Sequence, residues 1–219
     1  EEREIIGNWS KKARMEDAVS IKEGVGKLLK HAVPCVRGCS WKLFDTDESG
    51  FEEAERACKD ADYILACVGE HMLNSGEAHS RTDIRIPEIQ RKFVACLHKL
   101  NKPLALVVFG GRPLALSDVE KLADAILYVW QPGTEGGNAI ANLIYGKANP
   151  CGKTVMSFPR SVGQCPIYYN HFSTARPKRK DIPSFYSDER FRSGYDDEYN
   201  SPLPFLSLPD KISLYVSLA

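Results

Sequence analysis

The sequence lacks a net charge, a long apolar run and a recognisable leader. Its 29 basic and 29 acidic residues cancel, so no overall field attracts nucleic acid or an anionic membrane. No apolar stretch approaches the ~20 residues that span a bilayer, and the opening "EEREIIGNWS" has no basic region followed by an apolar run. We therefore expect no nucleic-acid partner and no membrane span, and a chain that is soluble as it stands or has lost its leader.

Motifs for metals, cofactors and nucleophilic serines are also missing. The seven cysteines are an odd number and suggest no disulfide framework. Cys35 and Cys39 have no second Cys/His pair at zinc-ligand spacing. The turn "GTEGG" is neither G-x-G-x-x-G nor a P-loop, so its glycines are expected to serve tight packing, and no G-x-S-x-G elbow is present. We expect neither a metal nor a cofactor.

What the sequence does have is an alternation of helical periodicity with short apolar runs. This pattern predicts an α/β fold, a mostly parallel sheet flanked by helices on both faces (an α/β sandwich), with right-handed crossovers. The expected helices are 17–32, 50–61, 87–100, 117–123 and 135–146, and the expected strands are 63–69, 104–109, 125–130 and 154–158.

The pattern changes near residue 170. Beyond it the chain is rich in Pro, Tyr and charge and follows neither period. We therefore expect one α/β-sandwich domain over 1–170 and an irregular, surface-wrapping tail over 171–219.

Parallel sheets bind ligands beyond the carboxyl ends of their strands. Three loops leave such ends, and one of them reads "SGEAHSRTDIRIPEIQ" (75–90). Its Glu77 is either an exposed loop carboxylate or a group that handles protons, and a general acid needs an apposed surface that removes water. Glu70, directly after the strand, is either the rival carboxylate or a side chain that accepts hydrogen bonds from backbone amides of the loop. Trp9 is either a partly buried aromatic or a surface on which a sugar ring stacks.

Four segments together resemble a known family. "VGEHMLNSGEAHSRTDIRIPEIQ", "NKPLALVVFGGRPLAL", "ADAILYVWQPGTEGGNAIANLIYGKANPCGK" and "MSFPRSVGQCPIYYNH" follow one another as in the second, α/β-sandwich domain of glycoside hydrolase family 3. The likeness is to the bacterial periplasmic β-glucosidase branch and extends from about Asn8 to about Pro204.

The resemblance implies a retaining hydrolase whose nucleophile is an Asp on a preceding (β/α)8 barrel. The acid/base is a Glu on a loop of the second domain, and Glu77 stands where that Glu is expected, with Glu70 in reserve. Trp9 matches the Trp that flanks the sugar subsite. Arg81 is a substrate-binding candidate, although together with Asp83 it fits a loop-ordering role better than substrate contact.

The same resemblance sets the expected partners and compartment. The partners are a barrel domain or subunit and a β-glucoside or oligosaccharide, in a periplasmic or secreted protein. The chain departs from the family in lacking the barrel and the first strand of the sheet. Its ending, "SPLPFLSLPDKISLYVSLA", is interpreted as a truncated or altered reading frame.

Two other functions remain open at this stage. One is a non-catalytic carbohydrate-binding or interaction module. The other is an independent hydrolase that uses Glu70 and Glu77 as its pair, which requires carboxyl groups about 5 to 5.5 Å apart for a retaining reaction.

Overall fold

Three parallel strands in the middle of the chain organise the structure. The computed structural model describes residues 5–10, 13–154, 156–168, 170, 172 and 214–216. These three strands are β1 (Ile64–Gly69), β2 (Leu104–Phe109) and β3 (Ala125–Trp130), and a short fourth strand, β4 (Leu214–Val216), joins them from the far end of the chain. They form a four-stranded sheet in the order β1-β2-β3-β4, and every pair is parallel.

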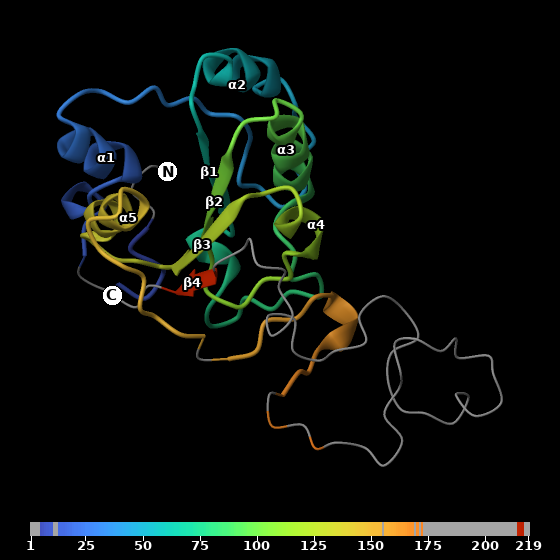
Figure 1. Ribbon diagram of the computed structural model, residues 1–219. Helices are drawn as coiled ribbons and strands as arrows, with labels where there is room; N and C mark the ends of the chain where they lie inside the picture. Colours follow the sequence, from blue (N-terminus) through green and yellow to red (C-terminus); the bar gives the residue numbers. More distant parts are fainter. Residues whose placement is uncertain are drawn as a thin grey trace.

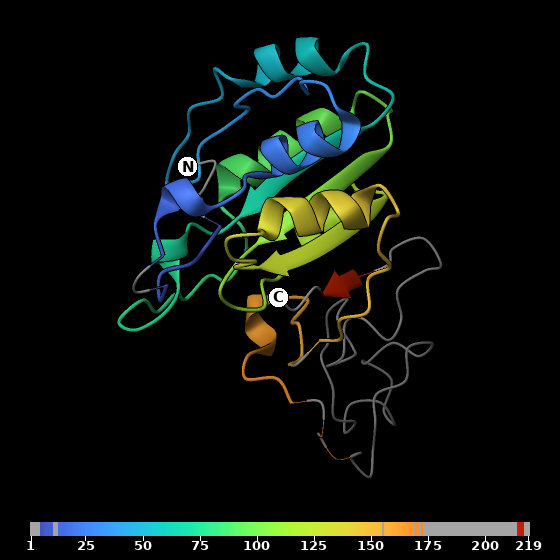
Figure 2. The ribbon, with the colours of Figure 1, turned by 90° about the vertical axis from the view of Figure 1, so that its left-hand side faces the viewer.

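Helices cover both faces of this sheet. The α-helices are α1 (Ile21–Leu29), α2 (Phe51–Cys58), α3 (Glu88–His98), α4 (Ser117–Glu120) and α5 (Gly136–Ile144), and the 3-10 helices are η1 (Met15–Asp17), η2 (Met72–Asn74) and η3 (Val162–Gln164). In Figure 1, α1 and α5 lie on one side of the strands and α3 and α4 on the other, with α2 at the top. Figure 2 looks onto the α1 and α5 layer. The predicted α/β sandwich is therefore confirmed.

Side chains on the two faces of the strands build two cores. The larger core packs Val94 and Leu97 of α3 against Leu106 of β2 and its neighbours, and the smaller joins Val107 of β2 to Ile140 of α5. Both faces of β2 are thus buried, which is why its sequence "LALVVF" is continuously apolar and does not alternate.

The fourth predicted strand, 154–158, was wrong. The described residues of that segment are not in a strand, and Leu214–Val216 pairs with β3 instead. Phe158 explains the misleading apolar signal, because its ring is buried edge-on against Tyr128 at a centroid distance of 5.0 Å. The loop contributes a core side chain without joining the sheet. Apart from residue 172 and β4, the predicted tail lies outside the described residues.

The other predicted elements are present, but the helices are shorter than predicted. The helix predicted for 17–32 begins at Ile21 because Ser20 and Glu23 form a capping box: the Ser20 hydroxyl accepts from the Glu23 amide, and the Glu23 carboxylate accepts from the Ser20 amide. It ends at Leu29, where Lys30 takes a left-handed conformation with φ 58°.

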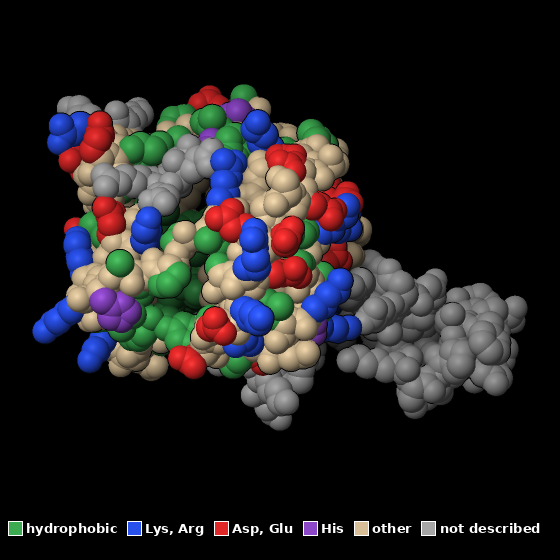
Figure 3. All heavy atoms as spheres, turned by 90° about the horizontal axis from the view of Figure 1, so that it is seen from above, with side chains coloured by type: hydrophobic (Ala, Val, Ile, Leu, Met, Phe, Trp, Pro, Cys, Tyr) green, Lys and Arg blue, Asp and Glu red, His purple; other side chains and the backbone are tan. Residues whose placement is uncertain are grey.

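A cavity of about 260 Å³ lies beside β1, which is an outer strand of the sheet in the described part of the chain. Its walls include Cys67 of β1, Ile21 of α1 and Trp41 of the long 30–50 connection. From above, hydrophobic side chains are visible in a hollow between the two helical layers (Figure 3). Glu77 is not among the residues that line this cavity.

Two glycines allow α1 to lie directly against the start of α5. A Cβ on Gly24 would come within 2.2 Å of the carbonyl oxygen of Gly137, and a Cβ on Gly137 within 2.1 Å of that of Ser20. Such distances leave no room for any side chain. Gly136 and Gly137, after β3, therefore serve tight packing, as the sequence suggested, whereas Gly133 has no atom within 4 Å of a new Cβ and takes a positive φ of 82°.

We expect Gly24→Ala to destabilise the chain by about 1–3 kcal/mol, because the new methyl group collides with backbone that cannot move alone. Gly26→Ala is the matched control in the same helix, where a new Cβ would lie 3.4 Å from the His31 carbonyl oxygen. Alanine there should leave stability unchanged or raise it by up to about 1 kcal/mol through helix propensity. Urea unfolding curves of both variants measure the difference, and equal effects would contradict the close contact.

Candidate active site at the carboxyl ends of the strands

The loops that follow β1, β2 and β3 meet the N-terminal segment 5–10 at one rim of the sheet. Glycines mark the contacts. A Cβ on Gly111, after β2, would lie 2.0 Å from Ser75 Oγ, after β1. A Cβ on Gly7 would lie 2.2 Å from Oε1 of Gln131, after β3. Four segments distant in sequence thus form one surface.

Glu77 is presented on a tight turn of this rim. Its neighbours Gly76 and Ala78 both have positive φ, 106° and 63°, and the His79 amide donates to the Gly76 carbonyl at 3.2 Å. Glu77 itself is exposed. Its carboxyl group therefore lies outside the hydrophobic core and is accessible to a molecule that docks on the rim.

Trp9 lies against the same turn. A Cβ on Gly76 would come within 2.9 Å of Trp9 Nε1, so the indole ring packs over the residue that precedes Glu77. The Trp9 side chain is nevertheless 56% exposed. The structure brings the predicted sugar-stacking residue and the predicted acid/base to one turn.

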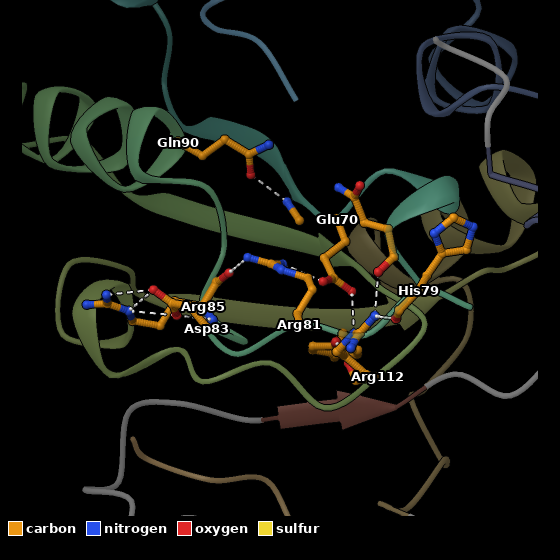
Figure 4. Close-up of polar contacts among 10 residues, drawn as sticks. Glu70, His79, Arg81, Asp83, Arg85, Gln90 and Arg112 are labelled. Atoms are coloured by element: carbon orange, nitrogen blue, oxygen red, sulfur yellow. Dashed lines mark hydrogen bonds and ion pairs between the residues drawn. The ribbon is translucent and has the colours of Figure 1, made fainter. Parts of the chain in front are cut away.

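Glu70 has the opposite environment. Its side chain is 0% exposed and pairs with the guanidinium groups of Arg81 and Arg112, the latter through Nε at 3.2 Å (Figure 4). Both carboxylate oxygens are thereby occupied by N–H donors. A buried charge is tolerated only when it is paired in this way.

Arg81 points inward, to Glu70, and away from solvent. Its side chain is 13% exposed, and its second terminal nitrogen donates to the Arg85 carbonyl at 3.1 Å. Next to it, Arg85 donates to both carboxylate oxygens of Asp83. Both contacts order the loop that carries Glu77.

Three residues of the rim were not singled out in the sequence. Arg112 contacts Glu70 and the loop, Tyr128 donates its hydroxyl to the Arg112 carbonyl, and the Gln90 side chain accepts from the Gly69 amide at 2.7 Å. A basic residue directly after a parallel strand, in "GGRPLAL", was the available signal for Arg112. Tyr128 and Gln90 carry no such signal, because an interior Tyr and a helical Gln are common.

The described residues contain no group of three or more His, Cys, Asp or Glu side chains that could hold a metal ion. Within the same part of the chain, no helix combines the length and the hydrophobicity that a membrane span requires.

Comparison with known proteins places the chain among glycoside hydrolases. Residues 1–199 match the model of the glycosyl hydrolase family 3 C-terminal domain. The periplasmic beta-glucosidase of Salmonella typhimurium is 38% identical over an alignment that covers 93% of this chain and 29% of that protein. A beta-xylosidase of Formosa agariphila is 37% identical, with 68% of this chain and 20% of that protein covered.

Solved structures agree in fold. The crystal structure of a beta-glucosidase from Listeria innocua in complex with glucose superposes with a TM-score of 0.78 at 33% identity. It covers 89% of this chain and 26% of that one. The chain therefore spans less than a third of the length of these similar proteins.

The Asp83–Arg85 pair makes a pH-dependent contribution to stability. The hydrogen bonds from Arg85 lower the pKa of Asp83 from 3.8 to about 2. Because the folded pKa lies below the unfolded one, the stabilisation is present above about pH 4 and is lost as the pH falls toward 2. The side chain is 46% exposed, so solvent screening keeps the effect small.

We therefore expect Asp83→Asn to lower the free energy of unfolding at neutral pH, and the deficit to shrink as the pH falls below about 4. Urea titrations across the pH range in which both proteins fold measure the deficit. Glu52→Gln, at an exposed position of α2, controls for the loss of one negative charge. A deficit that stays constant down to the lowest accessible pH would contradict the assignment.

Proposed function

The chain belongs to the glycosyl hydrolase family 3 C-terminal domain family, and from this premise we propose that it is the acid/base-bearing second domain of a retaining β-glucosidase-like enzyme. Its reaction is the hydrolysis of O-glycosyl bonds in β-linked glucosides or short β-glucans. The observation that carries the proposal is the exposed turn at the strand ends, which offers Glu77 beside the exposed indole of Trp9.

The two residues have different roles in the proposed reaction. Trp9 stacks on a sugar ring, since an indole face is a large apolar surface with a polar edge. Glu77 donates a proton to the glycosidic oxygen as the bond to the leaving group breaks, and then removes a proton from the water that releases the sugar. One carboxyl group thus acts first as acid and then as base.

The second carboxyl group of a retaining pair comes from outside this chain. Glu70 is enclosed by Arg81 and Arg112 and cannot attack an anomeric carbon from that position. We infer that a (β/α)8 barrel, on the same polypeptide or on another subunit, brings an Asp nucleophile to about 5 to 5.5 Å from Glu77. The barrel also supplies the surface that excludes water from Glu77. The chain is then inactive alone.

The compartment follows the same reasoning. The Salmonella relative is named a periplasmic beta-glucosidase, and we extend a periplasmic or secreted location to this chain.

In the enzyme that joins this chain to its barrel, we expect Glu77→Gln to lower kcat/KM for substrates with poor leaving groups by about 10²–10⁴-fold, the usual contribution of a general acid. Dinitrophenyl β-glucoside, whose leaving group needs no proton, should lose less than about tenfold. Azide should restore turnover of Glu77→Ala by forming a glycosyl azide, because the small anion occupies the place of the carboxylate.

Glu48→Gln is the matched control, since it makes the same chemical change at an exposed ion pair with Lys92 of α3. It should leave both substrates unaffected. An equal loss on poor and activated leaving groups in Glu77→Gln would contradict the acid/base role.

The isolated chain distinguishes this function from a carbohydrate-binding module, which the 56% exposure of Trp9 would also suit. Titration calorimetry with glucose and cellobiose should give no measurable heat, because half of the sugar site is missing, and nitrophenyl β-glucoside should remain intact. Saturable binding that is abolished by Trp9→Ala would favour the module instead. Hydrolysis by the chain alone would favour an independent Glu70 and Glu77 pair.

A further inference from the structure

We propose that Glu70 is a positioning residue, whose buried carboxylate holds Arg81 and Arg112 so that these two guanidinium groups fix the turn presenting Glu77. The inference rests on the proposed role of Glu77. It assigns Glu70, the reserve acid/base candidate, to a different task.

The cluster contains one negative and two positive side chains. Glu70 has no exposed side-chain surface, while Arg81 and Arg112 expose 13% and 21% of theirs. One carboxylate therefore lies between two guanidinium groups in a region with little water. Charged hydrogen bonds of this kind are strong and directional, and removing one partner leaves the others without compensation.

The remaining N–H groups of the two arginines donate to backbone carbonyls of the loop. Arg112 Nη2 donates to the carbonyls of Asn74 and His79, the latter at 3.0 Å. These two carbonyls precede and follow Glu77 in the chain, so one guanidinium group holds the two ends of the turn together. Arg81 holds the descending part of the loop through the Arg85 carbonyl. Figure 4 shows both guanidinium groups beside Glu70, with His79 above Arg112.

Hydrogen bonds also connect the cluster to the strands of the sheet. The Glu70 amide donates to the Phe109 carbonyl at 2.9 Å, which ties it to the end of β2. The Arg112 carbonyl accepts from Tyr128 of β3, a side chain with 0% exposure. The cluster thus connects the surface turn to the ends of three strands, whose spacing is fixed by the sheet.

The consequence is positional precision for Glu77. A misplacement of about 1 Å in a reacting group can cost about 10²-fold in rate, and neither a positive φ at Gly76 nor an exposed side chain fixes a carboxyl group by itself. Glu70 acts through Arg112 on the turn, and it touches no reacting atom.

The test compares Glu70→Gln with Glu77→Gln and Glu48→Gln in the enzyme that carries this chain. Glutamine keeps the shape of Glu70 but carries no negative charge and offers one acceptor oxygen where the carboxylate offers two. We expect hydrogen exchange of the amides in 74–80 to become faster by about tenfold or more. We also expect kcat/KM on poor leaving groups to fall by about 10²-fold, with a smaller loss on dinitrophenyl β-glucoside.

Two readouts separate positioning from direct catalysis. Glu70→Gln should retain the limb of the pH–rate profile that Glu77→Gln loses, because the proton donor is still present, and azide should not accelerate it. Azide rescue of a Glu70 variant together with loss of that limb would overturn the proposal, since Glu70 would then be the acid/base. Unchanged exchange and kinetics in Glu70→Gln would overturn it as well.

Arg112→Lys keeps the test decisive if Glu70→Gln fails to fold. Lysine keeps the positive charge, but its single nitrogen cannot replace both Nε of Arg112, which donates to Glu70, and Nη2, which donates to the two carbonyls. It should fold and show the same faster exchange and leaving-group dependence. If Glu77→Gln lacks its own leaving-group signature, the proposed function fails, while the exchange of 74–80 in Glu70→Gln and Arg112→Lys still decides whether the cluster holds the turn.

Discussion

The rim of this domain depends on one buried carboxylate, that of Glu70, paired with two arginines at the end of β1. A charge without exposed surface is costly unless all its oxygens are satisfied. Here the satisfaction comes from Arg81 in the loop after β1 and Arg112 in the loop after β2. The pairing of this one buried carboxylate therefore determines how the two loops lie against each other.

The contrast between Glu70 and Glu77 shows how environment divides the roles of identical residues. Seven positions apart on one loop, one carboxyl group is enclosed by guanidinium groups and the other is open to solvent beside Trp9. The enclosed one can hold structure but cannot reach a substrate. In the proposed function, the open one reaches a substrate but depends on other residues for its position. A second surface that closes over the open carboxyl group then completes the site.

The scaffold beneath the rim follows simpler rules of packing. Both faces of β2 and β3 are covered, and the glycine contact brings α1 and α5, the two helices of one layer, close to each other. This rigidity matters for the site, because the loops start from strand ends whose register is set by parallel pairing over Ile64–Gly69 and Leu104–Phe109. The positions of loop residues are set by the strands and helices from which the loops start.

The sequence by itself determined the α/β layering, the strands β1, β2 and β3 and the rim on which the loops gather, because continuous apolar runs and helical periodicity are local signals of burial. It also singled out Glu77, Glu70, Trp9, Arg81 and Asp83. Only the tertiary structure decided that Leu214–Val216, and not 154–158, lies beside β3. A short apolar segment can bury its side chains either as a strand or, as Phe158 does, from a loop, and the sequence does not distinguish the two. Only the tertiary structure separated Glu70 from Glu77, because the arginine that completes the enclosure, Arg112, lies 42 residues away in the chain and no local pattern records which charges meet in space.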